Sequence, residues 1–143
     1  MTQLNPYLTF DGNAEEAFNF YKSVFGSDLE GIMRWKDNPQ CEGMSDADKN
    51  KVMHAALKVG DSVIMGSDFV SMNGEAFQRG NDFSVAITPD TRSDADRLFA
   101  GLSDGGQPFM PMADMFWGGY FGAFADKFGV KWLINYDSNH GKQ

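Results

Sequence analysis

The segment LKVGDSVIM at residues 57–65 and the segment DKFGVKWLI at residues 126–134 can be laid on each other without a gap. Each has a glycine at its fourth position and then a mainly apolar run, which is typical of a turn leading into a strand. Residues 52–59 and 62–65 predict an antiparallel hairpin joined by the Gly60-Asp61 turn. We interpret the match, which is one of pattern more than of identity, as an internal repeat. The alternative is an α+β domain of another topology, in which the correspondence is coincidental.

The residues before the first hairpin predict that the first half of the chain runs β-α-β-β-β. Residues 6–10 read as a strand, and residues 13–25 as a helix with apolar residues at helical spacing. Asn13 is the expected N-cap, because an acidic residue follows three positions later. Residues 29–35 read as the next strand. The acidic stretch 37–51 has no regular period, so an irregular loop is expected there.

The second half repeats this order. Residues 83–88 read as a strand, and residues 93–102 as a helix whose expected hydroxyl cap is Ser93. Three further strands are predicted, at residues 107–112, 119–125 and 131–136. The chain is therefore expected to be a single α+β domain over residues 1–143, with one βαβββ module at residues 5–68 and a second at residues 82–137.

The composition narrows the classes of partner, ligand and cellular location that are expected. The 143 residues carry a net charge of −8, which disfavours partners such as nucleic acid or an anionic membrane surface. The 13 Phe, 9 Met and 3 Trp indicate a core or pocket lined by flat and polarisable side chains. No apolar run approaches the roughly 20 residues of a membrane span, and residues 1–5 do not look like a signal peptide. The single cysteine, Cys41, excludes an internal disulfide, so a cytoplasmic location is expected.

Several short segments carry a resemblance to a known family. They are PYLTF at 6–10, EA at 16–17, FY at 20–21, FG at 25–26, MHA at 53–55, GSD at 66–68, FW at 116–117 and DKFGVKWLIN at 126–135. Together they resemble the PhnB-like proteins of the glyoxalase/bleomycin resistance/dioxygenase, or vicinal oxygen chelate, superfamily. Some members carry the inherited label "3-demethylubiquinone 3-methyltransferase-like". The resemblance implies two βαβββ modules that form a curved mixed sheet around a cavity, usually in a homodimer, and it assigns no reaction.

In metal-using relatives, the resemblance implies His, Gln or Glu ligands on the first strand and the last strand of the modules. Here the first-strand positions fall at or beside residues 6–8 and 83–85, and the final-strand position falls at Leu133. None of these supplies an imidazole or a carboxylate. The histidines are His54 and His140, and the last strand has no Glu. We therefore predict no metal and no other cofactor.

The candidate ligand-binding residues are of two kinds. Trp35, Met65, Trp117 and Tyr120 are candidate apolar walls, and His54, Ser67 and Asn135 are candidate polar anchors. His54 is also the candidate general base, since strand alternation groups it with Val52, Ala56 and Lys58 on the more polar face. A hydrogen-bonded strand histidine without a catalytic role is the alternative. Ser67 and Asp68 could equally be turn formers, and the aromatic segment 116–120 could serve core packing or a dimer interface.

We weigh four functions. The first is the binding of a small, partly apolar or aromatic molecule without a metal, with no reaction assigned. The alternative is a divalent-metal-dependent lyase or isomerase of the glyoxalase type, or a dioxygenase. A methyltransferase would need a Gly-rich nucleotide loop between a strand and a helix, and Asp11-Gly12-Asn13 is too short for one. A purely structural dimer module remains if side chains fill the cavity.

Overall fold

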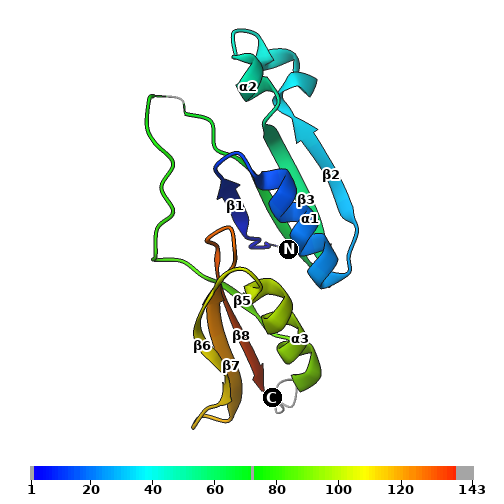
Figure 1. The fold of residues 1–143 in the computed structure, drawn as a ribbon. Helices are drawn as coiled ribbons and strands as arrows, with labels where there is room; N and C mark the ends of the chain where they lie inside the picture. Colours follow the sequence, from blue (N-terminus) through cyan, green and yellow to red (C-terminus); the bar gives the residue numbers. More distant parts are fainter. Residues whose placement is uncertain (1, 72, 138–143) are drawn as a thin grey trace. The chain divides into compact units, whose positions relative to one another are not determined.

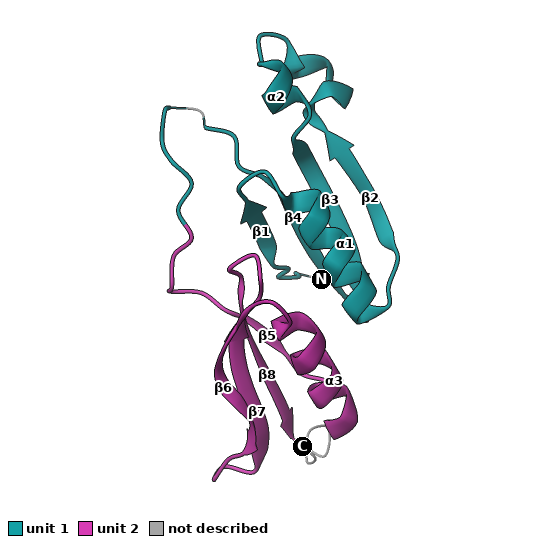
Figure 2. Cartoon of the chain, in the orientation of Figure 1, with its two compact units in different colours: residues 1–78 teal, residues 79–143 magenta. Residues whose placement is uncertain are grey.

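The computed structural model describes residues 2–71 and 73–137, so His140 lies outside the described residues. The chain divides into two compact units, Met1–Gln78 and Arg79–Gln143, called unit 1 and unit 2 below (Figure 2). None of the helices in the described part of the chain has the length and apolar character that a membrane span requires.

Unit 1 is a four-stranded mixed sheet with one long helix against it (Figure 1). Its main elements are β1 (Tyr7–Phe10), α1 (Ala14–Phe25), β2 (Leu29–Arg34), β3 (Val52–Val59) and β4 (Ser62–Asp68). The strand order is β1-β4-β3-β2, with β1 parallel to β4 and the other pairs antiparallel. This is the predicted βαβββ order.

Unit 2 repeats the arrangement. It contains β5 (Val85–Ile87), α3 (Arg92–Ser103), β6 (Gln107–Asp114), β7 (Gly119–Ala125) and β8 (Lys131–Asp137). The order β5-β8-β7-β6 matches that of unit 1, and here too the first and last strands are parallel neighbours. The α+β class and the repeated motif are confirmed.

The two hairpins that suggested the repeat occupy the same places in the two units, but the gapless alignment sets their faces one residue out of phase. Buried Ile64 lies on half-buried Leu133, and half-buried Met65 lies on buried Ile134. In the gapless alignment Ser62 lies on Lys131, and these residues begin β4 and β8. The connections differ, because β3 and β4 are joined by the two residues Gly60 and Asp61, whereas the chain between β7 and β8 runs from residue 126 to 130. The longer turn is organised by Asp126, whose Oδ1 accepts hydrogen bonds from the backbone N–H groups of Phe128 and Val130.

Each helix packs against a sheet face that carries the buried side chains of its unit. In unit 1, Phe10 and Phe18 pack edge to face with ring centroids 6.0 Å apart, and Phe18 makes the same contact with Tyr21. In unit 2, Phe99 of α3 packs edge to face on Phe124 at 5.0 Å. Aromatic pairs of this geometry stabilise a core beyond the area that they bury.

A bulge in β3 changes one prediction about the faces of this strand. The register passes from Met33 opposite His54 to Arg34 opposite Val52, so Met53 is the inserted residue. Val52 is consequently buried on the α1 side, whereas His54 lies on the opposite face. The predicted grouping of Val52 with His54 was wrong, because simple alternation fails at a bulge.

The caps of both helices also differ from prediction. Asn13 makes no side-chain cap hydrogen bond, and the N–H of Ala14 is instead bound by the distant Asp68. For α3, the hydroxyl of Thr91 accepts the hydrogen bond from Asp94 N, so Thr91 and not Ser93 is the cap.

The stretch between β2 and β3 is more regular than predicted. It forms η1 (Trp35–Asp37), η2 (Pro39–Cys41) and α2 (Asp46–Lys49). Side chains close these short turns locally, since Asn38 accepts a hydrogen bond from Gln40 N, and Ser45 accepts one from Asp48 N. Such turns need no hydrophobic period, so the periodicity that identifies longer helices could not reveal them.

Candidate functional site

The sheet face of unit 1 that lies opposite α1 brings three of the candidate site residues together. Met65 and Ser67 alternate with the buried residues of β4, and His54 follows the bulge of β3 on the same face. Tyr7 joins them from β1, because it pairs with Met65 and its ring centroid lies 6.0 Å from that of His54. Tyr7 is 49% exposed. The face therefore offers two rings, a thioether and a hydroxyl.

Trp35 occupies a different position. It begins η1, just beyond the end of β2, and its backbone N–H donates to Lys51 O at 3.2 Å. Its indole Nε1 is buried and has no hydrogen-bond partner among the described residues. Trp35 therefore lies on η1, whereas His54, Met65 and Ser67 lie on β3 and β4.

The face of unit 2 opposite α3 brings together Trp117, Phe121 and Asn135. Phe121 and Asn135 are cross-strand partners on β7 and β8, and the rings of Trp117 and Phe121 lie 6.0 Å apart in an edge-to-face contact. Gly119 lies between the two polar groups of this set. A Cβ atom built on Gly119 would be 2.5 Å from Asn135 Oδ1 and 2.5 Å from Trp117 Nε1. Asn135 Oδ1 is buried without a hydrogen-bond partner among the described residues.

Tyr120 lies on the other face of this sheet and so does not join Trp117 and Asn135. Its hydroxyl donates a 2.5 Å hydrogen bond to Asp96 Oδ1 on α3, and the Arg92 guanidinium lies 3.8 Å from its ring centroid. The hydrogen bond to Asp96 raises the pKa of Tyr120, since it favours the protonated phenol. Arg92 also binds both carboxylate oxygens of Asp114, and this hydrogen bonding lowers the pKa of Asp114. Tyr120 thus attaches α3 to its sheet.

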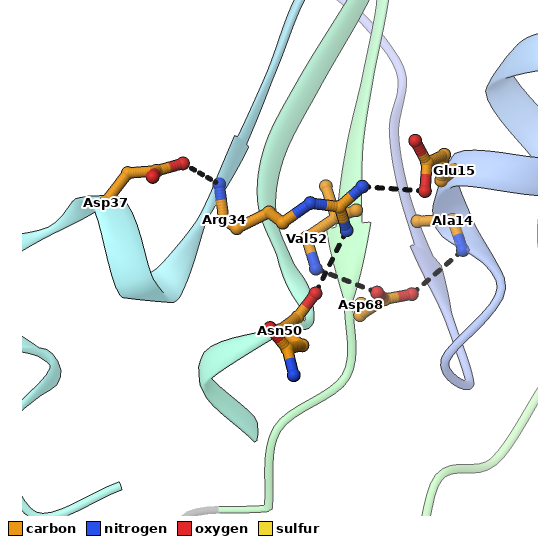
Figure 3. Close-up of polar contacts among 7 residues, drawn as sticks. All are labelled: Ala14, Glu15, Arg34, Asp37, Asn50, Val52 and Asp68. Atoms are coloured by element: carbon orange, nitrogen blue, oxygen red, sulfur yellow. Dashed lines mark hydrogen bonds and ion pairs between the residues drawn. The ribbon is translucent and has the colours of Figure 1, made fainter. Parts of the chain in front are cut away.

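A polar hollow of about 270 Å³ lies at the edge of unit 1 where β2, β3 and α1 meet. Arg34 donates to Glu15 Oε1 at 2.7 Å and to Asn50 O at 3.0 Å (Figure 3). Asp68, which is only 7% exposed, accepts hydrogen bonds from the N–H groups of Ala14 and Val52. These groups satisfy one another, so the hollow is a structural junction. The role of Asp68 is therefore structural, while Ser67 remains a candidate anchor.

The residues at the predicted metal-ligand positions do not fit a divalent ion. Tyr7 on β1 presents a phenol. The β5 residue that pairs with Leu133 of β8 is Ala86, one position beyond the predicted residues 83–85, and Ala86 and Leu133 present alkyl groups only. Divalent ions in this kind of site need imidazole or carboxylate donors. Within residues 2–71 and 73–137, no group of three His, Cys, Asp or Glu side chains is placed to hold a metal ion.

Two residues of these faces were not among the predicted site residues. Tyr7 was considered only as a position that lacks a metal ligand, although its place on the first strand was predicted. Phe121 lies between Tyr120 and Gly122, and strict alternation along 119–125 would have placed it with Gly119 on the face of Asn135. Alternation was the signal that could have separated Phe121 from Tyr120.

Comparison with known proteins agrees with the fold. The family model described as 3-demethylubiquinone-9 3-methyltransferase matches residues 2–135. Protein YjdN of Escherichia coli K12 is 29% identical over 140 residues, covering 92% of this chain and 93% of YjdN. The crystal structure of PA1353 from Pseudomonas aeruginosa is 36% identical, with a TM-score of 0.85 and coverage of 96% of this chain and 98% of that one.

Two further structures support the same assignment. A Bacillus cereus PhnB protein, described as a putative 3-demethylubiquinone-9 3-methyltransferase, is 29% identical with a TM-score of 0.73, covering 94% of this chain and 99% of that one. A glyoxylase/bleomycin resistance protein/dioxygenase domain from Frankia sp. EAN1pec has a TM-score of 0.66 at 15% identity, covering 96% of this chain and 98% of that one. At that identity the likeness concerns the fold alone.

Proposed function

The chain belongs to the family described as 3-demethylubiquinone-9 3-methyltransferase, the PhnB-like group with the glyoxalase/bleomycin resistance fold, and from that membership we propose that it binds a small, partly apolar or aromatic molecule without a metal ion. One observation carries the proposal. In each unit, the sheet face opposite the long helix is called the helix-free face below. On the helix-free face of unit 2, opposite α3, Trp117 and Phe121 form an aromatic wall beside Asn135. The Oδ1 atom of Asn135 has no hydrogen-bond partner among the described residues. Ligand sites typically combine such apolar walls with a few polar groups.

The helix-free face of unit 1 supports the same kind of ligand. Tyr7 and Met65 are adjacent strand partners that offer an aromatic ring and a polarisable thioether. Ser67 and His54 on the same face supply polar groups. His54 is the general base that we propose for any reaction on this face, because imidazole is the side chain that most often transfers protons in enzyme sites.

Methyl transfer, which the family description names, is not the activity that we propose. The usual nucleotide-binding fold needs a Gly-rich loop between a strand and a helix. Here β1 ends at Phe10 and α1 begins at Ala14, while β5 ends at Ile87 and α3 begins at Arg92. Both connections are too short for a phosphate-binding loop of that type.

A metal-dependent lyase, isomerase or dioxygenase is the second candidate from the superfamily. The donor set argues against it, since Leu133 and Ala86 occupy ligand positions on β8 and β5. For partners and location, we propose a cytoplasmic homodimer that binds neither nucleic acid nor membranes. The net charge of −8 and the apolar side chains exposed on each unit support this part of the proposal.

The test is a fragment screen followed by amide-resolved NMR. Uniformly ¹⁵N-labelled protein is titrated with flat aromatic fragments and with size-matched polar sugars. We expect the aromatic fragments to shift resonances of residues on the helix-free faces, and Trp117→Ala to weaken their binding. Phe20→Ala is the matched control, because Phe20 lies on α1 and not on either of these faces. The proposal is contradicted if no aromatic fragment binds, or if the shifts cluster around α1 and α3.

A further inference from the structure

Asn135 carries an unusual polar atom. Its Oδ1 is buried, and it has no hydrogen-bond partner among the described residues although a carboxamide oxygen can accept two hydrogen bonds. A buried acceptor without a partner carries an energetic cost that a suitable donor would remove. The cross-strand neighbour of Asn135 is Phe121, whose ring cannot supply that donor. An external donor is therefore the natural partner of this oxygen.

A donor close to this oxygen belongs to Trp117, and it has no hydrogen-bond partner among the described residues. Its indole Nε1 and Asn135 Oδ1 each lie 2.5 Å from the point where a Cβ of residue 119 would sit, so they are no more than 5 Å apart. A single oxygen can bridge two such groups, because hydrogen bonds of roughly 2.7–3.0 Å to each would span that separation at an open angle. The absence of a side chain at Gly119 lets both groups approach this point, because a Cβ there would lie only 2.5 Å from each of them.

We propose that Asn135 and Trp117 form a subsite for the hydroxyl group of an aromatic ligand. The inference rests on the proposed function and names the substrate class as hydroxylated aromatic molecules, such as phenols. A hydroxyl is a small group that donates and accepts at once, so it can donate to Asn135 Oδ1 and accept from Trp117 Nε1–H. A hydroxyl also fits both orientations of the Asn135 side-chain amide. If Nδ2 and not Oδ1 faces the ligand, the hydroxyl accepts a hydrogen bond from Nδ2.

Access to this subsite depends on the Trp117 side chain. Trp117 is 51% exposed and follows β6, in the turn that Met115 and Gly119 close through a backbone hydrogen bond. An exposed side chain of this kind changes rotamer rapidly. In the proposed complex the indole turns away from Asn135 Oδ1, the ligand hydroxyl inserts between the two groups, and the ligand ring packs against Phe121.

The experiment compares phenol with toluene, which has the same ring and a methyl group in place of the hydroxyl. Binding is followed by NMR on ¹⁵N-labelled protein through the Trp117 indole N–H and the Asn135 side-chain amide. We expect phenol to bind about tenfold more tightly than toluene, the size of one well-formed hydrogen bond to a buried acceptor. Phenol should also shift both side-chain resonances, whereas toluene should shift mainly the aromatic neighbours.

Two variants separate the subsite from the aromatic wall. Asn135→Leu keeps a similar volume and should bring the phenol-to-toluene ratio to about one without weakening toluene. Gly119→Ala should also bring this ratio to about one, because its methyl group occupies the point between the two polar groups. Asn81→Leu, at an exposed position outside the sheet, is the matched control and should keep the wild-type ratio.

The outcomes distinguish this inference from the proposed function. If toluene and phenol bind equally well to the wild type, the hydroxyl subsite is refuted while aromatic binding stands. An unchanged ratio in Asn135→Leu has the same meaning and does not depend on whether Gly119→Ala folds. If neither compound binds, the proposed function and the inference fall together.

Discussion

Asp68 Oδ1 accepts a hydrogen bond from the backbone N–H of Ala14 at 2.8 Å, so the last residue of β4 caps the first turn of α1 across 54 positions of sequence. Its Oδ2 accepts a second hydrogen bond, from Val52 N at 2.9 Å, where β3 begins (Figure 3). One buried carboxylate therefore joins a helix and two strands. A negative charge at the start of a helix is also favourable toward the helix dipole.

Replacing Asp68 by Asn should destabilise unit 1. The amide keeps one acceptor oxygen but turns an N–H₂ group toward one of the two backbone donors, so one buried N–H loses its partner. We expect a loss of about 2–3 kcal/mol in the free energy of unfolding, measured by urea denaturation. Asp61→Asn, in the exposed turn between β3 and β4, is the matched control and should change stability by less than about 0.5 kcal/mol. Equal effects of the two substitutions would contradict the capping role.

Gly66→Ala should destabilise the protein more than Gly119→Ala, because the atoms that surround the two glycines differ. A Cβ on Gly66 would lie 2.6 Å from the backbone oxygen of Leu8 and 2.9 Å from the Phe18 ring, so β1 would have to move. The Cβ on Gly119 meets only side-chain atoms of Asn135 and Trp117. We expect a loss of roughly 2–3 kcal/mol for Gly66→Ala and under about 1 kcal/mol for Gly119→Ala. Thermal unfolding of both variants measures this, and the reverse order would show that the close approach of β1 to β4 is not required.

Tyr120 should give stability a pH dependence in the alkaline range. Its pKa is raised in the folded protein because its hydroxyl donates to Asp96, so folding favours the protonated phenol. The stabilisation of the folded protein by this hydrogen bond is fully present below the unfolded pKa of tyrosine, about 10. It is lost as the pH rises through the higher pKa of Tyr120 in the folded protein. The stability difference between wild type and Tyr120→Phe should persist from pH 7 to about pH 10 and shrink above it.

Urea midpoints measured at intervals between pH 7 and pH 11 check this prediction. Absorbance at 295 nm gives an independent readout, because Tyr120→Phe should remove a component that ionises above the usual tyrosine range. Tyr136→Phe is the control for removing a phenol from the same sheet. A stability difference that stayed constant across pH 11 would show that the Asp96 hydrogen bond does not couple to ionisation.

Divalent ions should bind weakly and without selectivity. Leu133 and Ala86 cannot coordinate them, and His54 would be a single imidazole on its sheet face. Calorimetric titration with Zn²⁺, Ni²⁺, Mn²⁺ and Fe²⁺, on protein without a His tag, measures this. One equivalent bound at submicromolar affinity and abolished by His54→Ala would restore the metalloenzyme hypothesis.

The homodimer is tested by light scattering coupled to gel filtration at micromolar concentration. We expect a mass twice that of one chain, because both units expose large apolar side chains that a partner can cover. Replacing exposed Met33 of unit 1 or Phe109 of unit 2 by Lys should identify the unit that contributes to the interface. A single species of monomer mass across the concentration range would refute the dimer.

Much of the fold could be predicted because most of its helices and strands follow from the spacing of apolar residues and glycines along short segments. Helical spacing of apolar residues located α1 and α3, and alternation with glycine turns located the β3-β4 and β7-β8 hairpins. The features that were missed depend on contacts between distant residues or on irregular backbone. Asp68 replaces Asn13 as the cap only because β4 lies beside β1, and the inserted Met53 shifts the face of Val52 without any signal in composition.

The candidate site could be predicted only in part, for a related reason. A resemblance locates residues along the chain, whereas the face of a sheet depends on register. Trp117 and Asn135 are brought close together, but Tyr120 differs in face from its neighbour Phe121 and binds Asp96. The importance of Gly119 could not be seen from sequence, since it depends on the distance between two side chains.

The place of β4 beside β1 has a consequence for the order in which the growing chain folds. The sheet of unit 1 contains strands of unit 1 alone, and its first strand pairs with its last. Unit 1 therefore cannot close until residue 68 has left the ribosome. Residue 131, where β8 begins, leaves the ribosome roughly 3–13 s after residue 68, at about 5–20 residues per second. Mixed α/β domains fold faster than that, so unit 1 can be complete, with Asp68 already bound to Ala14, before the second sheet has all of its strands.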